Sequence, residues 1–335
     1  MIYLGEQKKA LSRYSEEVIC WLKIKLKGKT SKTNPDGHNC GQTSCKVCSR
    51  QFQIKNDLNP NFVRLFTDRN IHAIICSKPR ELIFKEDILC QMFIRFGYTK
   101  EKFKNECEKL FVKSGYEDFF YNTLNYRLAE WLNIHTCTYC NRQYTMVMRK
   151  PNGNKAMVPQ FDHWFAKSEH PLLALSFYNL IPSCGICNSS IKSTATLSLD
   201  NHFHPYVDNE ISNSFRFSYF AKSPNEYEVI CKSIDHSSLK AQNTIDILET
   251  KLLYKGHSKK ELQDLIDLRY KYSDNYLNTL LHKTFNGLDV TKSDKYRLLF
   301  GIEIDVKNYH KRPFSKFKKD IVDELISATN RIESF

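Results

Sequence analysis

Apolar residues between positions 80 and 134 recur at helical spacing. Phe120, Leu124 and Leu128 fall on one face of a helix that ends just before Cys137. Such a face is typical of a helix packed against a core. We therefore predict that this helix holds the cysteine-bearing segment after it in place.

The last third of the chain shows the same periodicity. Ser258 and Glu261 have the spacing of a capping box, in which the two side chains satisfy the first backbone amides of a helix. A further amphipathic helix is predicted from about Ser315. Its inward residues are expected to be Phe317, Ile321, Leu325 and Ile326.

Strand periodicity marks three other segments. In WLKIKLKGKT, the residues Leu22, Ile24 and Leu26 alternate with lysines, which predicts a strand with one lysine face. That face fits a solvated edge strand or, alternatively, a strand that follows phosphates. The runs QYTMVMRK and KAMVPQF flank an Asn-Gly turn and predict a hairpin over residues 142–161. FRFSYF and YEVICKS predict a second strand pair after residue 213.

The composition is that of a globular chain. Of 335 residues, 41% are hydrophobic and 26% are charged, which is enough apolar material for a sizeable core. There is no apolar run of membrane-spanning length, and the N-terminal sequence lacks the apolar region of a secretory signal. We expect a cytoplasmic protein without a membrane partner.

The formal net charge of +13 favours a polyanionic partner, with nucleic acid first. The stretch Lys307 to Lys319 mixes cations with Tyr309, Phe314 and Phe317. Such interleaving suits a surface that follows a nucleic-acid backbone and stacks on bases. A solvated charged face is the alternative interpretation.

Seven of the twelve cysteines fall into three tight groups. Two groups are CxxC pairs, Cys137 with Cys140 and Cys184 with Cys187. A CxxC pair directs both thiolates to one point, and two pairs complete a tetrahedral zinc site. A redox pair is disfavoured, because it needs only one such motif. Five other cysteines stand alone and are predicted to be small core residues: Cys20, Cys76, Cys90, Cys107 and Cys231.

The third group lies in a loop-rich stretch. His38, Cys40, Cys45 and Cys48 offer four ligands and predict a second zinc site that docks the N-terminal segment. His38 is the weakest member of this set. Incidental cysteines, or a site completed by a distant ligand, are the alternatives.

Residues between the two CxxC pairs, together with two just after the second pair, form a set suited to phosphodiester hydrolysis. His163 can take a proton from water at neutral pH. Asp162 and Asn188 offer the carboxylate and amide oxygens that Mg²⁺ or Mn²⁺ binds, and the cation would stabilise charge on the phosphate. We predict that Asn179 orients His163 through a backbone or ring contact. Lys192 is expected near the phosphate.

This order of motifs resembles the HNH endonucleases, the ββα-metal nuclease superfamily. The residues that carry the resemblance are CTYC…FDHW…YNLIPSCGICNSSIK, within about Cys137 to Pro205. The resemblance implies a metal-dependent endonuclease that cuts or nicks nucleic acid, usually DNA. Asn188 stands where many members have histidine.

The implied fold class is α+β, a mainly helical chain enclosing a zinc-stapled ββα-metal core. We expect the core at residues 131–210. Residues 1–130 would form an N-terminal segment of helices with the small zinc loop at 38–48. Residues 211–335 would form short strands and then a helical region.

A finer pattern, DHWFAKSEHP…LSFYNLIPSC…HFHPY, is similar to HNH nucleases of bacterial anti-phage defence systems, such as the Septu type. This similarity implies an ATPase or another defence-system subunit as partner. His202 and His204 follow the second CxxC pair, and His204 is a candidate phosphate contact. Lys167, in the loop after His163, is another.

Two other functions fit parts of the pattern. A non-catalytic zinc-finger-type module that binds nucleic acid or a protein partner would need the four cysteines but not Asp162, His163 and Asn188. An RNase or toxin nuclease would use the same scaffold, because the reaction engages the phosphate and not the base.

Overall fold

The computed structural model describes residues 1–30, 32, 37–43, 45–48, 57–153, 155–192, 196–234, 239–271, 279, 283 and 291–332. The chain divides into two compact units. The N-terminal unit comprises Glu6–Asn133 and Arg149–Ile181, and the C-terminal unit comprises Met1–Gly5, Ile134–Met148 and Pro182–Phe335. This division differs from the three predicted segments, because residues 131–210 are shared between the units.

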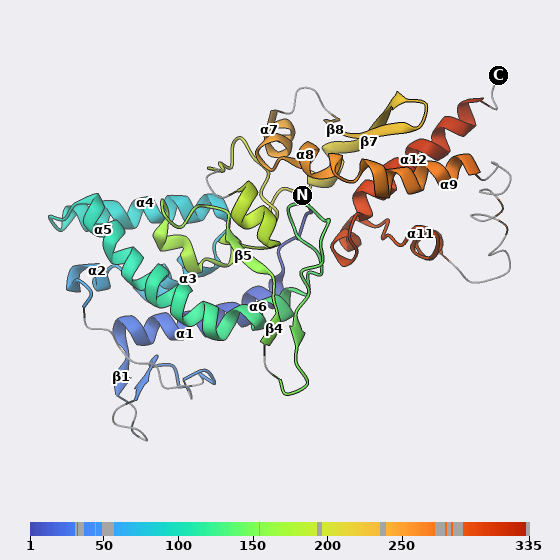
Figure 1. The fold of residues 1–335 in the computed structure, drawn as a ribbon. Helices are drawn as coiled ribbons and strands as arrows, with labels where there is room; N and C mark the ends of the chain where they lie inside the picture. The colour runs from blue at the N-terminus through green and yellow to red at the C-terminus, as the bar shows by residue number, and fades with distance from the viewer. Residues whose placement is uncertain are drawn as a thin grey trace. The chain divides into compact units, whose positions relative to one another are not determined.

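The N-terminal unit is built mainly from helices (Figure 1). They are α1 (Lys8–Lys27), α2 (Pro60–Arg64), α3 (Asp68–Cys76), α4 (Pro79–Arg95), α5 (Lys100–Cys107), the π-helix η1 (Glu108–Leu124) and α6 (Asn125–Leu132). The predicted helical region 80–134 is confirmed. It is interrupted at Gly97, whose φ of 87° lies in the left-handed region that favours glycine.

The predicted strand in WLKIKLKGKT is wrong, because its alternating residues Leu22 to Lys27 lie in α1. Tyr14, Val18 and Trp21 are buried at helical spacing, and the helix runs through the alternating residues without a break. Lys23 is buried as well, and its ammonium lies 3.1 Å from the carboxylate of Asp68. Packing on several sides of the helix therefore overrides the local two-residue period.

Short strands form two-stranded sheets in the described residues up to Ser183. The hairpin prediction is confirmed by β3 (Met148–Arg149), which pairs with β4 (Lys155–Met157). β5 (Gln160–His163) pairs with β6 (Leu180–Ser183), and β1 (Lys29–Thr30) pairs with β2 (His38–Asn39).

Two 3₁₀ helices, η2 (Pro171–Leu175) and η3 (Phe177–Asn179), lie between β5 and β6. η2 packs against η1. A side chain at Gly115 of η1 would lie 2.7 Å from Leu175, so glycine permits this close approach.

The C-terminal unit combines a hairpin with helices. Its strands β7 (Phe215–Ser223) and β8 (Glu226–Ser233) are antiparallel, with Phe215 opposite Ser233, which confirms the second strand pair. Its helical elements are η4 (Ile186–Ile191), η5 (Ile211–Asn213), α7 (Leu239–Ile247), α8 (Thr250–Lys255), η6 (Ser258–Leu262), α9 (Gln263–Lys271), α11 (Lys292–Phe300), η8 (Val306–Lys311) and α12 (Ser315–Ile332).

Aromatic packing between β7 and α12 forms the core of this unit. The ring of Phe217 lies 4.3 Å from that of Tyr254 and 5.4 Å from that of Phe317. Phe317, Ile321 and Leu325 of α12 are buried, as predicted. Ile326 lies in the part of α12 whose side-chain burial is not described.

Ser258 begins a helical segment, but its side chain is not the predicted cap. The Ser258 hydroxyl accepts a hydrogen bond of 3.1 Å from the Val229 amide of β8. The residue before it, His257, stands at the cap position without a side-chain hydrogen bond to the helix. A tertiary contact has thus taken the hydroxyl that the local motif would use.

The fold class is α+β, since helices predominate and the described strands form only two-stranded sheets. The presence of two four-cysteine groups agrees with the zinc-stapled part of the prediction. Within the described residues, no helix combines the length and the apolarity that a membrane span requires.

Candidate functional site

His163 ends strand β5 and is almost completely buried, with 7% of its surface exposed. Its Nε2 lies 3.0 Å from the backbone oxygen of Ala174. A carbonyl oxygen can only accept a hydrogen bond, so Nε2 carries the proton. In the neutral ring Nδ1 is then the basic nitrogen. This tautomer is the one in which His163 can take a proton at Nδ1.

Tyr116 of η1 packs against His163. The two rings are 4.3 Å apart with an interplanar angle of 64°, and the Tyr116 hydroxyl donates a 2.8 Å hydrogen bond to the Phe161 oxygen. Burial, and then the negative charge of Asp162, raises the pKa of Tyr116. Its phenol therefore stays protonated and fixes one wall of the site.

The sequence interpretation missed Tyr116, although a signal exists. It lies one helical turn before Phe120, at the start of the apolar face already identified. The rings of Tyr116 and Phe120 stack at 5.1 Å. The face that was predicted to be core thus also supports the predicted catalytic histidine.

Asn179 is fully buried and organises the loop after β5. Its Oδ1 accepts from the Phe165 amide at 2.7 Å, and its Nδ2 donates to the oxygens of Phe165 at 3.2 Å and Leu173 at 3.0 Å. Its own backbone oxygen accepts from the Trp164 amide at 3.0 Å. The side chain thus holds the loop that supplies the Ala174 oxygen to His163.

Lys167 lies in the same loop and is part of the wall formed by Tyr116. Its ammonium is 3.2 Å from the Glu117 carboxylate and 5.2 Å from the centre of the Tyr116 ring. The exposed fraction of the Lys167 side chain is 39%. An ion pair this exposed is weak, so a phosphate can compete for Lys167.

Asp162 precedes His163 and is equally buried, at 7%. Outside the two cysteine groups, the described residues contain no cluster of three or more His, Cys, Asp or Glu side chains that could hold a metal ion. A carboxylate oxygen is the kind of ligand that Mg²⁺ prefers, and the catalytic cation at Asp162 stays a prediction.

The four cysteines of the two CxxC pairs come together in the C-terminal unit. Their Sγ atoms all lie within 4.8 Å of one another, with Cys140 and Cys184 4.0 Å apart. None is more than 5% exposed. A tetrahedral zinc–thiolate centre needs sulfur–sulfur distances of about 3.8 Å, so the group is compatible with zinc. We call Cys137, Cys140, Cys184 and Cys187 the buried cluster.

The four thiols of this cluster differ in how readily they ionise. Burial raises the pKa of Cys137, and contact with the Cys137 thiol raises that of Cys187. Contact with the Cys137 thiol outweighs the opposing contact with Cys140 and lowers the pKa of Cys184 to about 7. Contacts with Cys137 and its neighbours also lower the pKa of Cys140, whose sulfur in addition accepts from the Arg142 amide at 3.4 Å. Thiolates, not thiols, are the ligands of zinc.

Asn188 and Lys192 follow the second CxxC pair, which we also call the second knuckle. The Asn188 amide donates to the Cys184 oxygen at 3.0 Å, and the Lys192 amide donates to the Cys187 oxygen at 3.0 Å. Both belong to the C-terminal unit, whereas Asp162 and His163 belong to the N-terminal unit. The knuckle therefore fixes the backbone of Asn188 within its own unit.

His204 is fully buried in the C-terminal unit. Its amide donates to the Asp208 carboxylate at 2.6 Å, and its Nδ1 accepts from the Tyr206 amide at 3.3 Å. The neighbouring His202 accepts at Nδ1 from the Ser198 amide at 3.1 Å, and burial lowers the pKa of its ring. Both histidines stabilise turns here, and the substrate contact assigned to His204 stays a prediction.

The third cysteine group has a different fourth member from the one predicted. Cys20 joins Cys40, Cys45 and Cys48, with all four Sγ atoms within 4.8 Å of one another, and His38 is not part of the set. Cys20 was predicted to be a solitary core residue. The correction arises because Cys20 lies on α1, far from the loop in sequence, and faces it only after folding. We call these four residues the half-exposed cluster.

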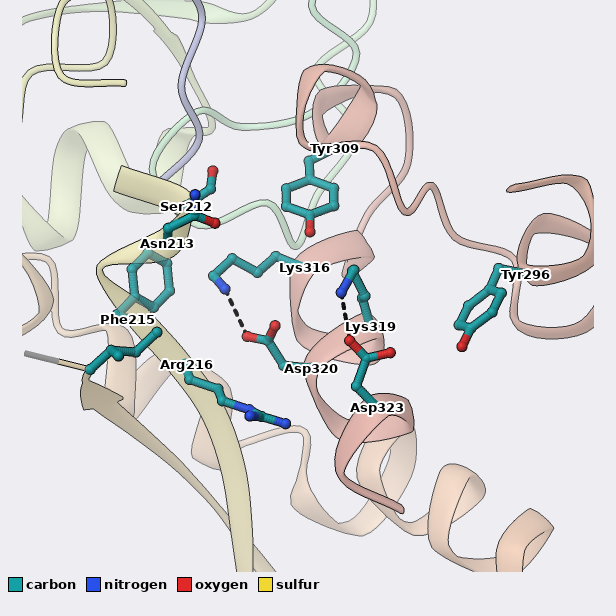
Figure 2. A pocket seen from close by; sticks show the side chains of 11 residues that line it. Ser212, Asn213, Phe215, Arg216, Tyr296, Tyr309, Lys316, Lys319, Asp320 and Asp323 are labelled. Atoms are coloured by element: carbon teal, nitrogen blue, oxygen red, sulfur yellow. Dashed lines mark hydrogen bonds and ion pairs between the residues drawn. The ribbon is translucent and has the colours of Figure 1, made fainter. Parts of the chain in front are cut away.

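The basic stretch 307–319 also differs from its prediction. Tyr309 and Phe317 are buried, so these two rings cannot stack on bases in this conformation. Figure 2 shows Lys316 and Lys319 of α12 reaching carboxylates one turn further along, at 2.8 and 2.5 Å. They line a cavity of about 560 Å³ in the C-terminal unit, where their charges are offset by those partners, Asp320 and Asp323.

Comparisons with known protein families, with curated proteins and with solved structures found no match for this chain. The functional interpretation therefore rests on the residues and the geometry of the two units.

Proposed function

We propose that the protein is a metal-dependent endonuclease of the HNH type that hydrolyses phosphodiester bonds of DNA. The observation that carries the proposal is the hydrogen bond from His163 Nε2 to the Ala174 oxygen. It selects the tautomer whose Nδ1 can accept a proton from an attacking water. The effector nuclease of an anti-phage defence system is the biological role that the sequence resemblance favours.

His163 would act as general base, and its surroundings suit that role. The Tyr116 ring and the Ala174 oxygen hold the imidazole in one orientation, which lowers the entropic cost of reaching the reactive geometry. The Ala174 oxygen also stabilises the imidazolium that forms when Nδ1 takes a proton. Asn179 is a positioning residue, because it holds the loop that carries this oxygen.

Asp162 and Asn188 would hold the catalytic cation. A bound Mg²⁺ or Mn²⁺ supplies positive charge to the scissile phosphate and the departing oxygen. Lys167 and Lys192 would contact the phosphates of the substrate. The order of the motifs along the chain is the reason for assigning Asn188 and Lys192 to the same reaction as Asp162 and His163.

The test is cleavage of supercoiled plasmid and of structured RNA in the presence of Mg²⁺ or Mn²⁺. His163→Ala should reduce the rate by about 10²- to 10⁴-fold, the usual contribution of a general base. His72→Ala is the matched control, because His72 is exposed on α3. The control should cleave at the wild-type rate.

Two further measurements make the result specific. The zinc content of His163→Ala should equal that of the wild type, since neither cysteine group contains this residue, and thermal denaturation should show that the variant is folded at the assay temperature. Equal cleavage by His163→Ala and an active wild type would refute the general-base assignment. Cleavage of RNA alone would favour an RNase on the same scaffold. Nucleic-acid binding without any cleavage would favour a non-catalytic zinc module.

A further inference from the structure

We propose that Cys20, Cys40, Cys45 and Cys48 bind one zinc ion in a closed four-thiolate site that fastens the loop 37–48 to helix α1. The site is separate from the candidate nuclease residues. It gives the N-terminal unit a metal centre of its own.

The sulfur positions support this assignment. The Cys48 Sγ lies 3.4 Å from that of Cys20 and 3.3 Å from that of Cys40, and the Cys45 Sγ lies 3.5 Å from that of Cys20. These distances are close to the edge of a zinc–thiolate tetrahedron, about 3.8 Å. The four sulfurs surround one point from two separate segments of the chain.

The backbone around the sulfurs is typical of a metal knuckle. The Cys40 amide donates to the Cys48 sulfur at 3.3 Å. Amides that point at sulfur favour the thiolate form that a cation requires.

Hydrogen bonds within the described part of the loop join near neighbours, apart from the two residue pairs of β1 and β2 and the contacts with cysteine sulfurs. The Cys45 amide donates to the Gln42 oxygen at 3.3 Å, and the Gly41 amide donates to Asn39 Oδ1 at 3.0 Å. The apolar anchor of the loop is Val47, which packs with Cys20 and Ile24 of α1. A bound ion would therefore supply much of the order of this segment.

A zinc ion bound at Cys20 would also affect the packing of helix α1. Trp21, the neighbour of Cys20, stacks on Phe119 of η1 at 4.9 Å with nearly parallel rings. Tyr14, two turns earlier, donates to the Leu175 oxygen at 2.8 Å. The ion would thus stabilise the helix that packs on η1 and η2 within the same unit.

His38 is the competing ligand, and the geometry disfavours it. His38 pairs with Thr30 in the small sheet, and its ring nitrogens do not belong to the group formed by the four cysteine sulfurs. Zinc bound by Cys40, Cys45, Cys48 and His38 would leave Cys20 without a metal bond. The two arrangements predict different effects of single substitutions.

The first experiment counts zinc in the purified full-length chain by mass spectrometry. Wild type should contain two zinc ions per chain, and Cys20→Ala should contain one. His38→Ala should retain two. Cys107→Ala is the matched control, because Cys107 is a buried cysteine of the same unit outside the cluster, and it should also retain two. Exchange with Co²⁺ should give the intense visible bands of four-thiolate coordination at both sites.

A second experiment uses the wild-type chain, so it succeeds even when Cys20→Ala does not fold. A chelator removes zinc from the half-exposed cluster, which should lose its metal first. An alkylating reagent then labels the free thiols, and peptide mass spectrometry locates the labels. Cys20 should become reactive together with Cys40, Cys45 and Cys48, while Cys107 stays unlabelled.

Several results would overturn the proposal. Two zinc ions in Cys20→Ala would exclude Cys20 as a ligand. One zinc in His38→Ala would favour the histidine, and iron in place of zinc would refute the identity of the metal. Labelling of Cys20 at the same rate before and after chelation would show that it does not bind the ion.

Discussion

The two four-cysteine groups differ in how much protein surrounds them. The buried cluster consists of two CxxC knuckles in the C-terminal unit, and every thiol is 5% exposed or less. The half-exposed cluster combines one CxxC pair, one further loop cysteine and one helical cysteine, and only Cys20 among them is fully buried. The same donor set thus occurs in two different environments.

The surroundings of the buried cluster are extensively hydrogen-bonded. Asn141 follows Cys140 directly, and its Nδ2 lies 2.9 Å from the Thr136 hydroxyl, 3.0 Å from the Tyr309 oxygen and 3.1 Å from the Arg312 oxygen. The two hydrogens of Nδ2 are therefore shared among three acceptors. The Tyr254 hydroxyl donates to the Cys140 oxygen at 2.7 Å. Near the half-exposed cluster, Asn39 accepts one exposed bond of 3.0 Å from the Gly41 amide. We infer that the buried cluster is central to its unit, whereas the other one fastens a loop.

The largest effect is expected from breaking the buried cluster. Cys137→Ala should release one zinc and unfold the C-terminal unit, because structural zinc contributes about 10–16 kcal/mol to folding in small zinc-binding peptides. Thermal denaturation and zinc content measure this. Cys231→Ala, at a buried cysteine of the same unit outside the cluster, should keep both zinc ions. Equal effects of the two substitutions would refute a structural role of the metal.

The second prediction concerns the rate of metal loss. A chromophoric chelator should remove zinc in two phases of equal amplitude, with the faster one from the half-exposed cluster, because its sulfurs are more accessible. Cys20→Ala should lack the fast phase. A single phase in the wild type would contradict the proposed difference between the clusters.

The third prediction compares the two asparagines. Asn141→Ala should lower the free energy of unfolding by roughly 2 kcal/mol, at about 1 kcal/mol for each of the two N–H groups of Nδ2 that donate hydrogen bonds. Asn39→Ala should cost less than about 1 kcal/mol, since its bond is exposed. Chemical denaturation measures both.

Asn141 also has a positive φ of 51°, which disfavours alanine. Asn141→Gly removes the hydrogen bonds without this penalty and so separates the two effects. A cost for Asn141→Gly as small as that for Asn39→Ala would show that the hydrogen bonds around the buried cluster contribute little.

The smallest effect is a pH dependence in the N-terminal unit that is independent of its cysteines. The His170 Nδ1 lies 2.6 Å from the Glu86 carboxylate. Burial lowers the pKa of His170, but the carboxylate outweighs it and the net pKa is raised above 6.5. The stability from this pair is therefore fully present below pH 6.5 and is lost as the pH rises through the raised value.

Glu86→Gln should reduce the melting temperature at about pH 6 and have less effect at about pH 9. The comparison separates titration of this pair from competition between protons and metal at the half-exposed cluster. A difference from wild type that stays constant over this range would exclude the ion pair as its source.

Local patterns predicted a large part of the fold. The helical region 80–134, the hairpin around the Asn-Gly turn, the strand pair after residue 213 and the final helix are all present. The strand in α1 failed because a period of two over a few residues cannot reveal burial on several sides of a longer helix. Ser258 failed as a cap because its hydroxyl bonds to Val229 of β8.

Candidate site residues, too, could be predicted where they depend on local spacing and not where they depend on distant segments. The buried cluster could be predicted because each knuckle is local, and a CxxC spacing by itself directs two thiolates to one point. The fourth member of the other group could not, since Cys20 lies on a helix 25 residues before Cys45. The wall that Tyr116 forms against His163 also depends on packing between distant segments.

The sequence by itself determined the knuckles, the adjacent Asp162 and His163, and most helices and hairpins, because these depend on neighbours within a few residues. Only the tertiary structure decided that Cys20 replaces His38 and that Tyr116 and the Ala174 oxygen orient His163. These contacts join segments far apart in the chain. Their partners are selected by packing and hydrogen-bond satisfaction throughout a unit, which no local spacing encodes.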